Sequence, residues 1–348
     1  MEFGLFVEFP CRDGVSQAQV FQESFQLVDA AEELGTDAVW LAEYHFDPNR
    51  SVLAAPITVA SAVAARTKRV KIGIAVHVLP LRNPVRIAEE VATLDHISGG
   101  RLDFGIGRSA FPSVYLGFGM DYDESRDRFS ECLEVILKSW TEERFSYQGE
   151  YYQYDNLYVV PKPLQSPHPP IRVGATSVET FALVGRMGYP IFINPSRVSS
   201  LSDLVPMIKE FREARIDAGY PAEVDVGLRV PVYVAETKEQ AYSEPKESAL
   251  YQLQRLINVI AASASQGGIS DDRLAQAERL KGLDYDAMLK NMVIYGSPEM
   301  VTERLMQLQE ELGINQFVYE VNFGCRVPLE HQIKSVRLLN ERVAPNFK

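Results

Sequence analysis

The 348-residue sequence predicts a closed barrel of eight parallel strands, each followed by a helix, in one domain over residues 1–348. Two observations lead to this prediction. Short apolar runs alternate with longer amphipathic stretches, which is the pattern of strand–helix units. The runs are nearly continuous, as expected for strands buried on both faces. Single barrels routinely reach this length. A doubly wound open sheet has the same alternation, so it stays an alternative.

The strand predictions follow the apolar runs in chain order. They are Phe3–Val7, Ala38–Leu41, Val70–Val76, Leu102–Ile106, Ile171–Val173, Pro190–Ile193, Leu228–Val234 and Gln316–Val321. The helix predictions between them rest on amphipathic spacing together with start and stop residues. They are Gln17–Leu34, Pro84–Ile97, Ser125–Trp140, Ser177–Met187, Leu201–Ala218 and Pro298–Leu312.

Two segments exceed a minimal barrel. Trp140–Pro170 is rich in Tyr and Pro, and it predicts a small insertion before the fifth strand. Tyr242–Asn291 predicts a long loop after the seventh strand, with Ala261–Gly268 as its flexible part. Long loops in compact domains are often functional. Because this one follows a strand at the face where barrel active sites lie, we interpret it as a lid.

Composition narrows the class of protein. The net charge of −12 disfavours nonspecific binding to nucleic acid, which requires basic side chains, but it leaves room for an anionic ligand in a basic pocket. Three widely spaced cysteines argue against a disulfide framework and for a reducing compartment. The start lacks the features of a signal peptide, and no apolar stretch is long enough to cross a bilayer. We expect a soluble, cytoplasmic protein.

The carboxyl ends of barrel strands carry the functional groups of such folds. In this sequence those ends hold polar and ionisable residues. They are Glu43-Tyr44-His45, Ala75-Val76-His77, Gly107-Arg108-Ser109, Gly174-Ala175-Thr176-Ser177 and Glu320-Val321-Asn322.

One of these ends predicts a phosphate site. Thr176 and Ser177 stand directly before a helix that contains Thr180, where hydroxyls and unpaired backbone N–H groups can bind an anion. Arg108, at the neighbouring strand end, could add a bidentate clamp. The alternative is that Ser177 only caps its helix and Arg108 pairs with a surface carboxylate.

His45 could act as a general base or as a hydrogen-bond donor at the end of the second strand. A lone histidine is more often structural, and the signal at His77 is weaker still. No set of His, Cys or carboxylate residues has metal-ligand spacing, so we predict no metal.

Other ligand motifs fail on context. Gly105-Ile106-Gly107 with Ala110 fits G-x-G-x-x-A, but Pro112 breaks the helix that this motif must open. Neither a nucleophile elbow nor a P-loop occurs.

Four segments resemble the bacterial luciferase-like flavin monooxygenases. They are MEFGLFVE, DAVWLAEYHF, VKIGIAVHVLPLRNPVRIAEEVATLDHISGGRLDFGIGR and RVGATSVETFALVGRMGYP, and later YGSPEMV and INQFVYEV agree with them. The resemblance runs over nearly the whole chain and is weakest across Tyr242–Asn291.

The resemblance implies a barrel that receives reduced FMN from a separate flavin reductase and reacts it with O2 to give a flavin C4a-hydroperoxide. It implies that Arg108, Ser177 and Thr180 bind the flavin phosphate, beside Ala175 and Thr176. It further implies that Glu43, Ala75 and Val76 form the wall beside the isoalloxazine ring, with a non-prolyl cis peptide between Ala75 and Val76.

The sequence departs from the light-emitting enzymes of the family at one position. Those enzymes have two consecutive histidines after the glutamate, and the first is catalytic. Here Tyr44 takes its place and only His45 remains. With an ordinary pKa of about 10, a tyrosine is a poor base at neutral pH. Aldehyde oxidation with light emission is therefore not expected.

These inferences predict an FMNH2-dependent monooxygenase of a small organic substrate, with His45 and Tyr44 as the catalytic candidates and a homodimer as the assembly. Two alternatives stay open. One is hydride transfer with the deazaflavin F420 on the same fold. The other is a flavin-binding protein without catalysis.

Overall fold

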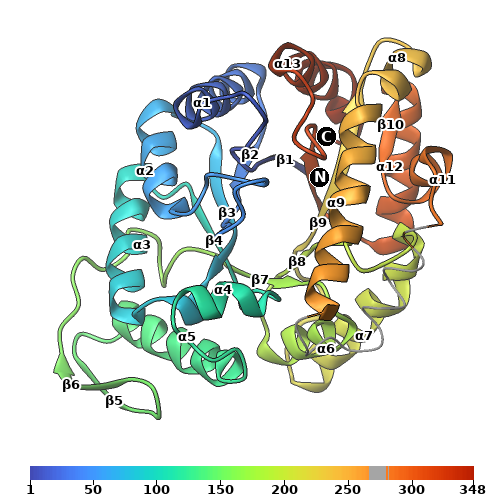
Figure 1. Ribbon diagram of the computed structural model, residues 1–348. Coiled ribbons are helices and arrows are strands. Elements are labelled where there is room, and N and C mark those ends of the chain that lie inside the picture. Colours follow the sequence, from blue (N-terminus) through green and yellow to red (C-terminus); the bar gives the residue numbers. More distant parts are fainter. Residues whose placement is uncertain (266–279, 281) are drawn as a thin grey trace.

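The computed structural model of the protein describes residues 1–265, 280 and 282–348. Its centre is a barrel of eight parallel strands, surrounded by helices (Figure 1). In order around the barrel the strands are β1 (Glu2–Val7), β2 (Ala38–Leu41), β3 (Lys71–Val78), β4 (Leu102–Gly107), β7 (Ile171–Ala175), β8 (Ile191–Ile193), β9 (Val226–Val234) and β11 (Gln316–Glu320). The pairings β8–β9 and β11–β1 close the ring. The predicted barrel is confirmed, and the open-sheet alternative is wrong.

The helices pack outside the strands. They are α1 (Gln17–Leu34), α2 (Pro56–Arg66), α3 (Pro84–Ser98), α4 (Pro112–Gly117), α5 (Ser125–Thr141), α6 (Val178–Met187), α7 (Leu204–Asp217), α8 (Lys238–Ser243), α9 (Lys246–Ser265), α11 (Tyr285–Asn291), α12 (Pro298–Leu312) and α13 (Leu329–Leu338). Short 3-10 or π turns occupy Leu79–Leu81, Leu201–Asp203, Leu339–Val343 and Ala344–Phe347. Helix ends follow local chemistry: Gly35 closes α1 in the left-handed conformation, and the Asn83 side chain caps α3.

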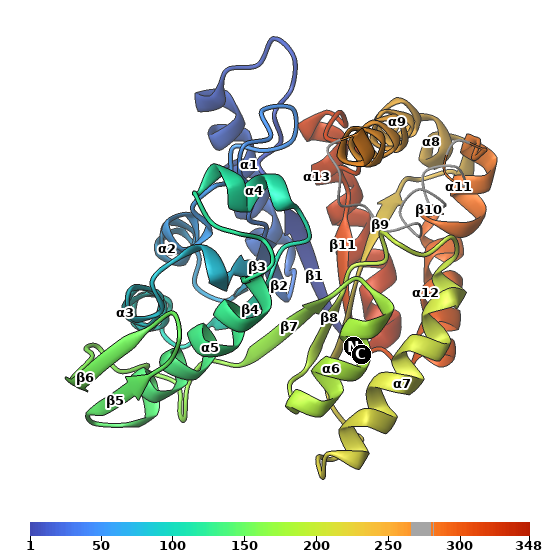
Figure 2. The same cartoon turned by 60° about the horizontal axis from the view of Figure 1, so that its bottom comes forward.

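The insertion before the fifth barrel strand is an antiparallel hairpin of β5 (Phe145–Gln148) and β6 (Gln153–Leu157). It projects from the barrel beside α5 (Figure 2). This confirms the insertion predicted for Trp140–Pro170.

The prediction of a long loop over Tyr242–Asn291 is wrong for the residues that the structure describes. Helix α9 covers Lys246–Ser265 and α11 covers Tyr285–Asn291, and the short strand β10 (Ile294–Gly296) then pairs with β9. Buried Ala249, Leu253 and Met288 pack with Tyr233 of β9, so apolar burial makes these segments helical. Within the predicted flexible stretch, residues 261–265 end α9, and residues 266–268 lie outside the described residues.

Glycines set how closely the first strands approach one another. Trp40 of β2 is fully buried, and a Cβ at Gly4 or Gly73 would overlap its ring. On β4, a Cβ at Gly105 would overlap the carbonyl oxygen of Ile74. Gly105 is thus explained by strand contact rather than by a dinucleotide motif. No helix within the described residues has both the length and the apolar composition that crossing a bilayer requires.

Candidate functional site

The candidate site lies at the barrel mouth, where the carboxyl ends of the strands meet. Helices α4 and α9 lie at this end, opposite the two chain termini (Figure 2). The segment Glu43-Tyr44-His45 leaves β2 here, and His77 lies one residue before the end of β3 beside it, because β2 and β3 pair in parallel. The mouth therefore collects ionisable side chains from strands that are neighbours in the sheet.

Glu43 lies between two histidines. Its Oε1 is 2.7 Å from His45 Nε2 in a hydrogen bond, and its Oε2 is 2.7 Å from His77 Nδ1. The backbone N–H of Val78 also donates to Oε2, at 3.2 Å. The side chains of Glu43 and His77 are fully buried, and His45 is only 7% exposed. Three nitrogen atoms, from His45, His77 and the Val78 backbone, thus contact one buried carboxylate.

The neighbours decide the charge of Glu43. Burial alone would raise its pKa, but His77 and His45 outweigh burial and lower the pKa to about 2. Glu43 is therefore a carboxylate at neutral pH. Because a carboxylate only accepts hydrogen bonds, Nε2 of His45 carries a proton. Glu43 therefore engages Nε2, not Nδ1, of the His45 ring.

The Ala75–Val76 peptide bond is cis, which is the geometry that the family resemblance implies. The register between β3 and β4 shifts between Ile74 and His77. The Val76 side chain packs against the backbones of two neighbouring strands. A Cβ at Gly107 would overlap Val76, and one at Gly174 would come within 2.9 Å of Val76 Cγ1. Both glycines are thus needed for Val76 to lie flat against β4 and β7.

The N-terminus of α6 stabilises negative charge. Ser177 precedes the helix, and its hydroxyl lies 2.8 Å from that of Thr180. The Glu179 carboxylate lies at the same end. Its own backbone N–H and the Ser177 hydroxyl lower its pKa, and Arg197 and Arg126 lower it further. A helix N-terminus with arginines nearby is an arrangement that favours an anion.

Arg108 lies on the β4 side of this region. Its Nη1 donates to Ser125 Oγ at 2.7 Å, and its guanidinium lies over the Tyr122 ring. Ser125 begins α5 and precedes Arg126, whose positive charge lowers the pKa of Glu179. Ala175 and Thr176 form the turn from β7 into α6, where the Asn194 N–H donates to the Ala175 carbonyl at 3.0 Å. The predicted phosphate residues therefore flank two helix N-termini, those of α5 and α6.

Tyr44 belongs to a separate buried cluster. Its hydroxyl donates to Glu8 Oε1 at 2.8 Å, and Arg50 contacts both groups. Nη2 of Arg229 lies 3.2 Å from Glu8 Oε1 and 2.7 Å from Glu320 Oε2, so Arg229 pairs with both carboxylates. Burial raises the pKa of Tyr44 above its ordinary value. Tyr44 is thus a protonated donor held by Glu8.

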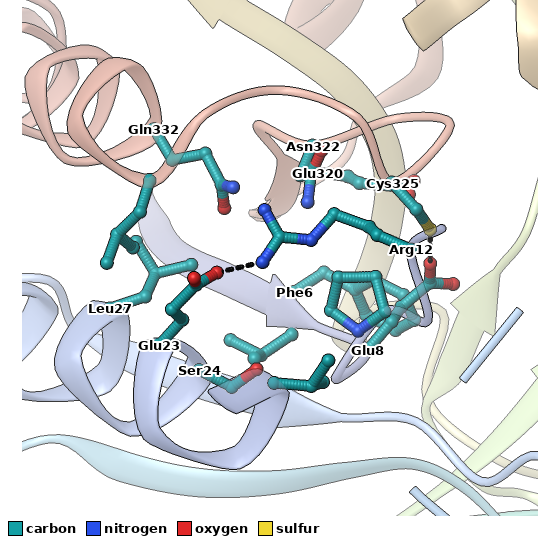
Figure 3. Close-up of a pocket in the computed structure, with 14 residues that line it drawn as sticks. Phe6, Glu8, Arg12, Glu23, Ser24, Leu27, Glu320, Asn322, Cys325 and Gln332 are labelled. Carbon is teal, nitrogen blue, oxygen red and sulfur yellow. Dashed lines mark hydrogen bonds and ion pairs between the residues drawn. The ribbon is translucent and has the colours of Figure 1, made fainter. Parts of the chain in front are cut away.

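Of two cavities at this end of the barrel, one borders this cluster through Glu8 and Glu320. The smaller one, about 30 Å³, has room for about one water molecule. Figure 3 shows Arg12 reaching across it to pair with Glu23, while Glu8 and Cys325 lie at its other side. The larger cavity, about 300 Å³, opens between α9 and the loops that follow β1, β2 and β11. Of these two, the larger has the volume of a small-molecule pocket.

The comparison with protein families decides the class of enzyme. Residues 1–316 match the model of the luciferase-like monooxygenase family. The chain belongs to this family. It is an oxidoreductase, as the sequence resemblance predicted.

Named relatives of this luciferase-like monooxygenase cover the full chain. The oxygenase component of the flavin-dependent trigonelline monooxygenase of Acinetobacter baylyi is 28% identical over 360 residues, covering 100% of this chain and 96% of that protein. The solved structure of monooxygenase RslO1 from Streptomyces bottropensis is 26% identical with a TM-score of 0.83, covering 100% of both chains. The oxygenating constituent of 3,6-diketocamphane monooxygenase from Pseudomonas putida, solved with FMN, is 24% identical with a TM-score of 0.84, covering 99% and 98%. At 24% identity this last match shows the shared fold alone.

Sequence reasoning missed several residues of this luciferase-like monooxygenase's mouth. It undervalued His77, although the residue's place at a strand end was visible. It did not single out Arg126, whose position at the start of a predicted helix was the available signal. Arg50 and Arg229 gave no local signal, because their partner Glu8 lies 42 and 221 residues away in the chain.

Proposed function

We propose that the protein is the oxygenase partner of a separate flavin reductase, and that it uses reduced FMN and O2 to oxidise a small organic substrate. The observation that carries this proposal is the α6 N-terminus with its nearby arginines, at the same barrel end as the dry Glu43–His45–His77 group. The α6 N-terminus is suited to a phosphate, and the Glu43–His45–His77 group is suited to a redox-active ring. The trigonelline monooxygenase relative, which is named as flavin-dependent and as an oxygenase component, supports the flavin and a separate reductase.

Bound reduced FMN would supply two electrons to O2, so that one oxygen atom enters the substrate and the other leaves as water. The remaining roles belong to the chain. Ser177, Thr180 and Arg108 would hold the phosphate, with Ala175 and Thr176 shaping the turn. Glu43, Ala75 and Val76 would form the wall beside the ring. The apolar side chains of Ala75 and Val76 would help to exclude water from the reacting atoms.

His45 is the group we propose for proton transfer. Because Glu43 engages Nε2, we propose that Nδ1 is the nitrogen that exchanges a proton with the substrate. Tyr44 donates to Glu8 and stays protonated, so we propose that it contributes a hydrogen bond or a fixed surface rather than a base. The role of Tyr242–Asn291 as a lid, a homodimer and a cytoplasmic location remain predictions.

F420-dependent hydride transfer is the competing function. Titrating the purified protein with FMN and F420 in parallel separates the two. We expect FMN to bind more tightly. Tighter binding of F420 would contradict the proposed function.

The phosphate anchor has its own prediction. Arg108→Ala should weaken FMN binding by about 1.5–3 kcal/mol, the range for a charged hydrogen bond. Riboflavin, which lacks the phosphate, should lose much less. Calorimetric titration measures both, and Arg304→Ala on outer helix α12 is the control. Equal losses for FMN and riboflavin would remove Arg108 from the phosphate site.

A further inference from the structure

Glu8 is a buried carboxylate to which the proposed reaction gives no role. It follows β1 directly and is 6% exposed. Its Oε1 accepts hydrogen bonds from the Tyr44 hydroxyl at 2.8 Å, from Arg229 Nη2 at 3.2 Å and from Arg50 Nη2. Its Oε2 lies 3.7 Å from Cys325 Sγ (Figure 3). One carboxylate oxygen therefore gathers side chains from three separate parts of the barrel mouth.

The Tyr44 hydroxyl both donates and accepts a hydrogen bond inside this cluster. It donates its hydrogen to Glu8, and Arg50 Nη2 donates to its oxygen at 3.3 Å. The Arg50 guanidinium also lies over the Tyr44 ring, 5.1 Å from its centroid. Because a phenol has one hydrogen to donate, the hydrogen that Glu8 accepts is withheld from any ligand. The hydroxyl is therefore a fixed group rather than a free acid.

The charges in contact with this hydroxyl balance while Glu8 is ionised. Arg50 and Arg229 bring two positive charges, and Glu8 and Glu320 bring two negative ones. The two guanidiniums favour a phenolate at Tyr44, whereas the Glu8 carboxylate disfavours it. Burial is the largest cause of the raised pKa of Tyr44, and Glu8 raises this pKa further against both arginines. Loss of the Glu8 charge would thus leave excess positive charge beside the hydroxyl.

The other ionisable groups around the cluster add little charge to it. On α9, Gln252 Oε1 accepts from Arg50 at 2.8 Å and from Arg255 at 3.2 Å. Arg255 in turn pairs with Asp47 at 3.1 Å, so these two opposite charges offset each other. Burial raises the pKa of the Cys325 thiol to about 12, so this thiol is neutral at physiological pH. The carboxylate and the two arginines that contact the hydroxyl or its partner therefore decide its state.

We propose that Glu8 is a positioning residue for Tyr44: it holds the hydroxyl as a neutral donor to itself and so leaves proton transfer to His45. Without this carboxylate, Arg50 and Arg229 would hold Tyr44 as a phenolate, which is a base. Glu8 thus suppresses a second base at the mouth. The consequence for the reaction rests on the proposed function, but the state of the hydroxyl can be measured without flavin or substrate.

The test measures phenolate by its ultraviolet absorbance at a pH of about 10, where a tyrosine of ordinary pKa is half ionised. Each protein is compared with the same protein carrying Tyr44→Phe, so that the other tyrosines cancel. We expect Tyr44 to be a phenol in the wild type. In Glu8→Gln its ratio of phenolate to phenol should be at least about tenfold higher, the smaller end of the effect of a neighbouring charge.

Glu320→Gln is the matched control. It removes one negative charge from the same cluster, but the Glu320 carboxylate pairs with Arg229 and not with Tyr44 among the described residues. Tyr44 should remain a phenol in this variant. Circular dichroism establishes that each variant is folded.

Three results would overturn the proposal: a phenolate at Tyr44 in the wild type, a phenol in folded Glu8→Gln, or equal phenolate in Glu8→Gln and Glu320→Gln. If Glu8→Gln does not fold, proton NMR of the wild type decides. We expect one slowly exchanging hydroxyl hydrogen that Tyr44→Phe removes, and a wild type without it would overturn the proposal too. Failure of the wild type to bind FMN would contradict the proposed function separately, because the phenolate measurement needs no FMN.

Discussion

His45→Ala should lower substrate oxidation by about 10²–10⁴-fold, the usual scale for a general acid–base group, with FMN affinity nearly unchanged. The physical reason is the fixed tautomer of the ring. Glu43 Oε1 accepts from Nε2 at 2.7 Å, so Nδ1 is the nitrogen that can exchange a proton with a ligand. Alanine removes that nitrogen but leaves the phosphate residues intact.

The measurement is the amount of substrate oxidised per reduced FMN in a single turnover. His96→Ala is the matched control, because His96 lies on α3 and bonds only the Lys162 carbonyl among the described residues. Tyr44→Phe should have a smaller effect than His45→Ala, since it removes a hydrogen bond to Glu8 rather than a base. Tyr44→His should restore some activity on aldehydes if the pocket accepts an extended chain. Wild-type turnover in His45→Ala would exclude His45 as the catalytic group.

Glu43→Gln should destabilise the fold at neutral pH by about 3 kcal/mol, the free energy that corresponds to its pKa shift. The folded protein lowers the pKa of Glu43 from 4.5 to about 2, with burial opposed by His77 and His45. A lowered pKa means that the stabilisation is complete above pH 4.5 and is lost as the pH falls through about 2. The difference in stability between wild type and variant should therefore shrink on acidification.

Urea unfolding of both proteins from neutral to acidic pH measures this difference. The control is Glu310→Gln on the exposed face of α12, which should match the wild type at every pH. A difference that stays constant across the pH range would show that the carboxylate's charge does not stabilise the folded mouth.

The fold was predictable because its signal is local. Strands such as Ala38–Leu41 are buried on both faces and read as unbroken apolar runs. Helix α9 was missed because it packs on a satellite cluster around Tyr233 rather than on the main barrel core, and its sequence looked weakly patterned.

The candidate site was predictable only in part. Glu43, His45, Arg108 and Ser177 follow from their places at strand ends. The partners of Tyr44 do not, because Glu8 lies 36 residues before it and Arg229 is reached only by closing the barrel. His77 became informative once the structure placed it 2.7 Å from Glu43. Pairings across a closed sheet have no local sequence signal.

We propose that this mouth holds reduced FMN while it meets O2. Its most direct test mixes reduced FMN with the protein without oxygen, then adds O2 and follows the appearance of oxidised FMN by stopped-flow absorbance. Because a dry site shelters the reacting flavin, we predict that oxidised FMN appears more slowly with the protein than without it, and that Arg108→Ala weakens this delay. Identical time courses with and without the protein, at concentrations that bind FMN fully, would contradict the account.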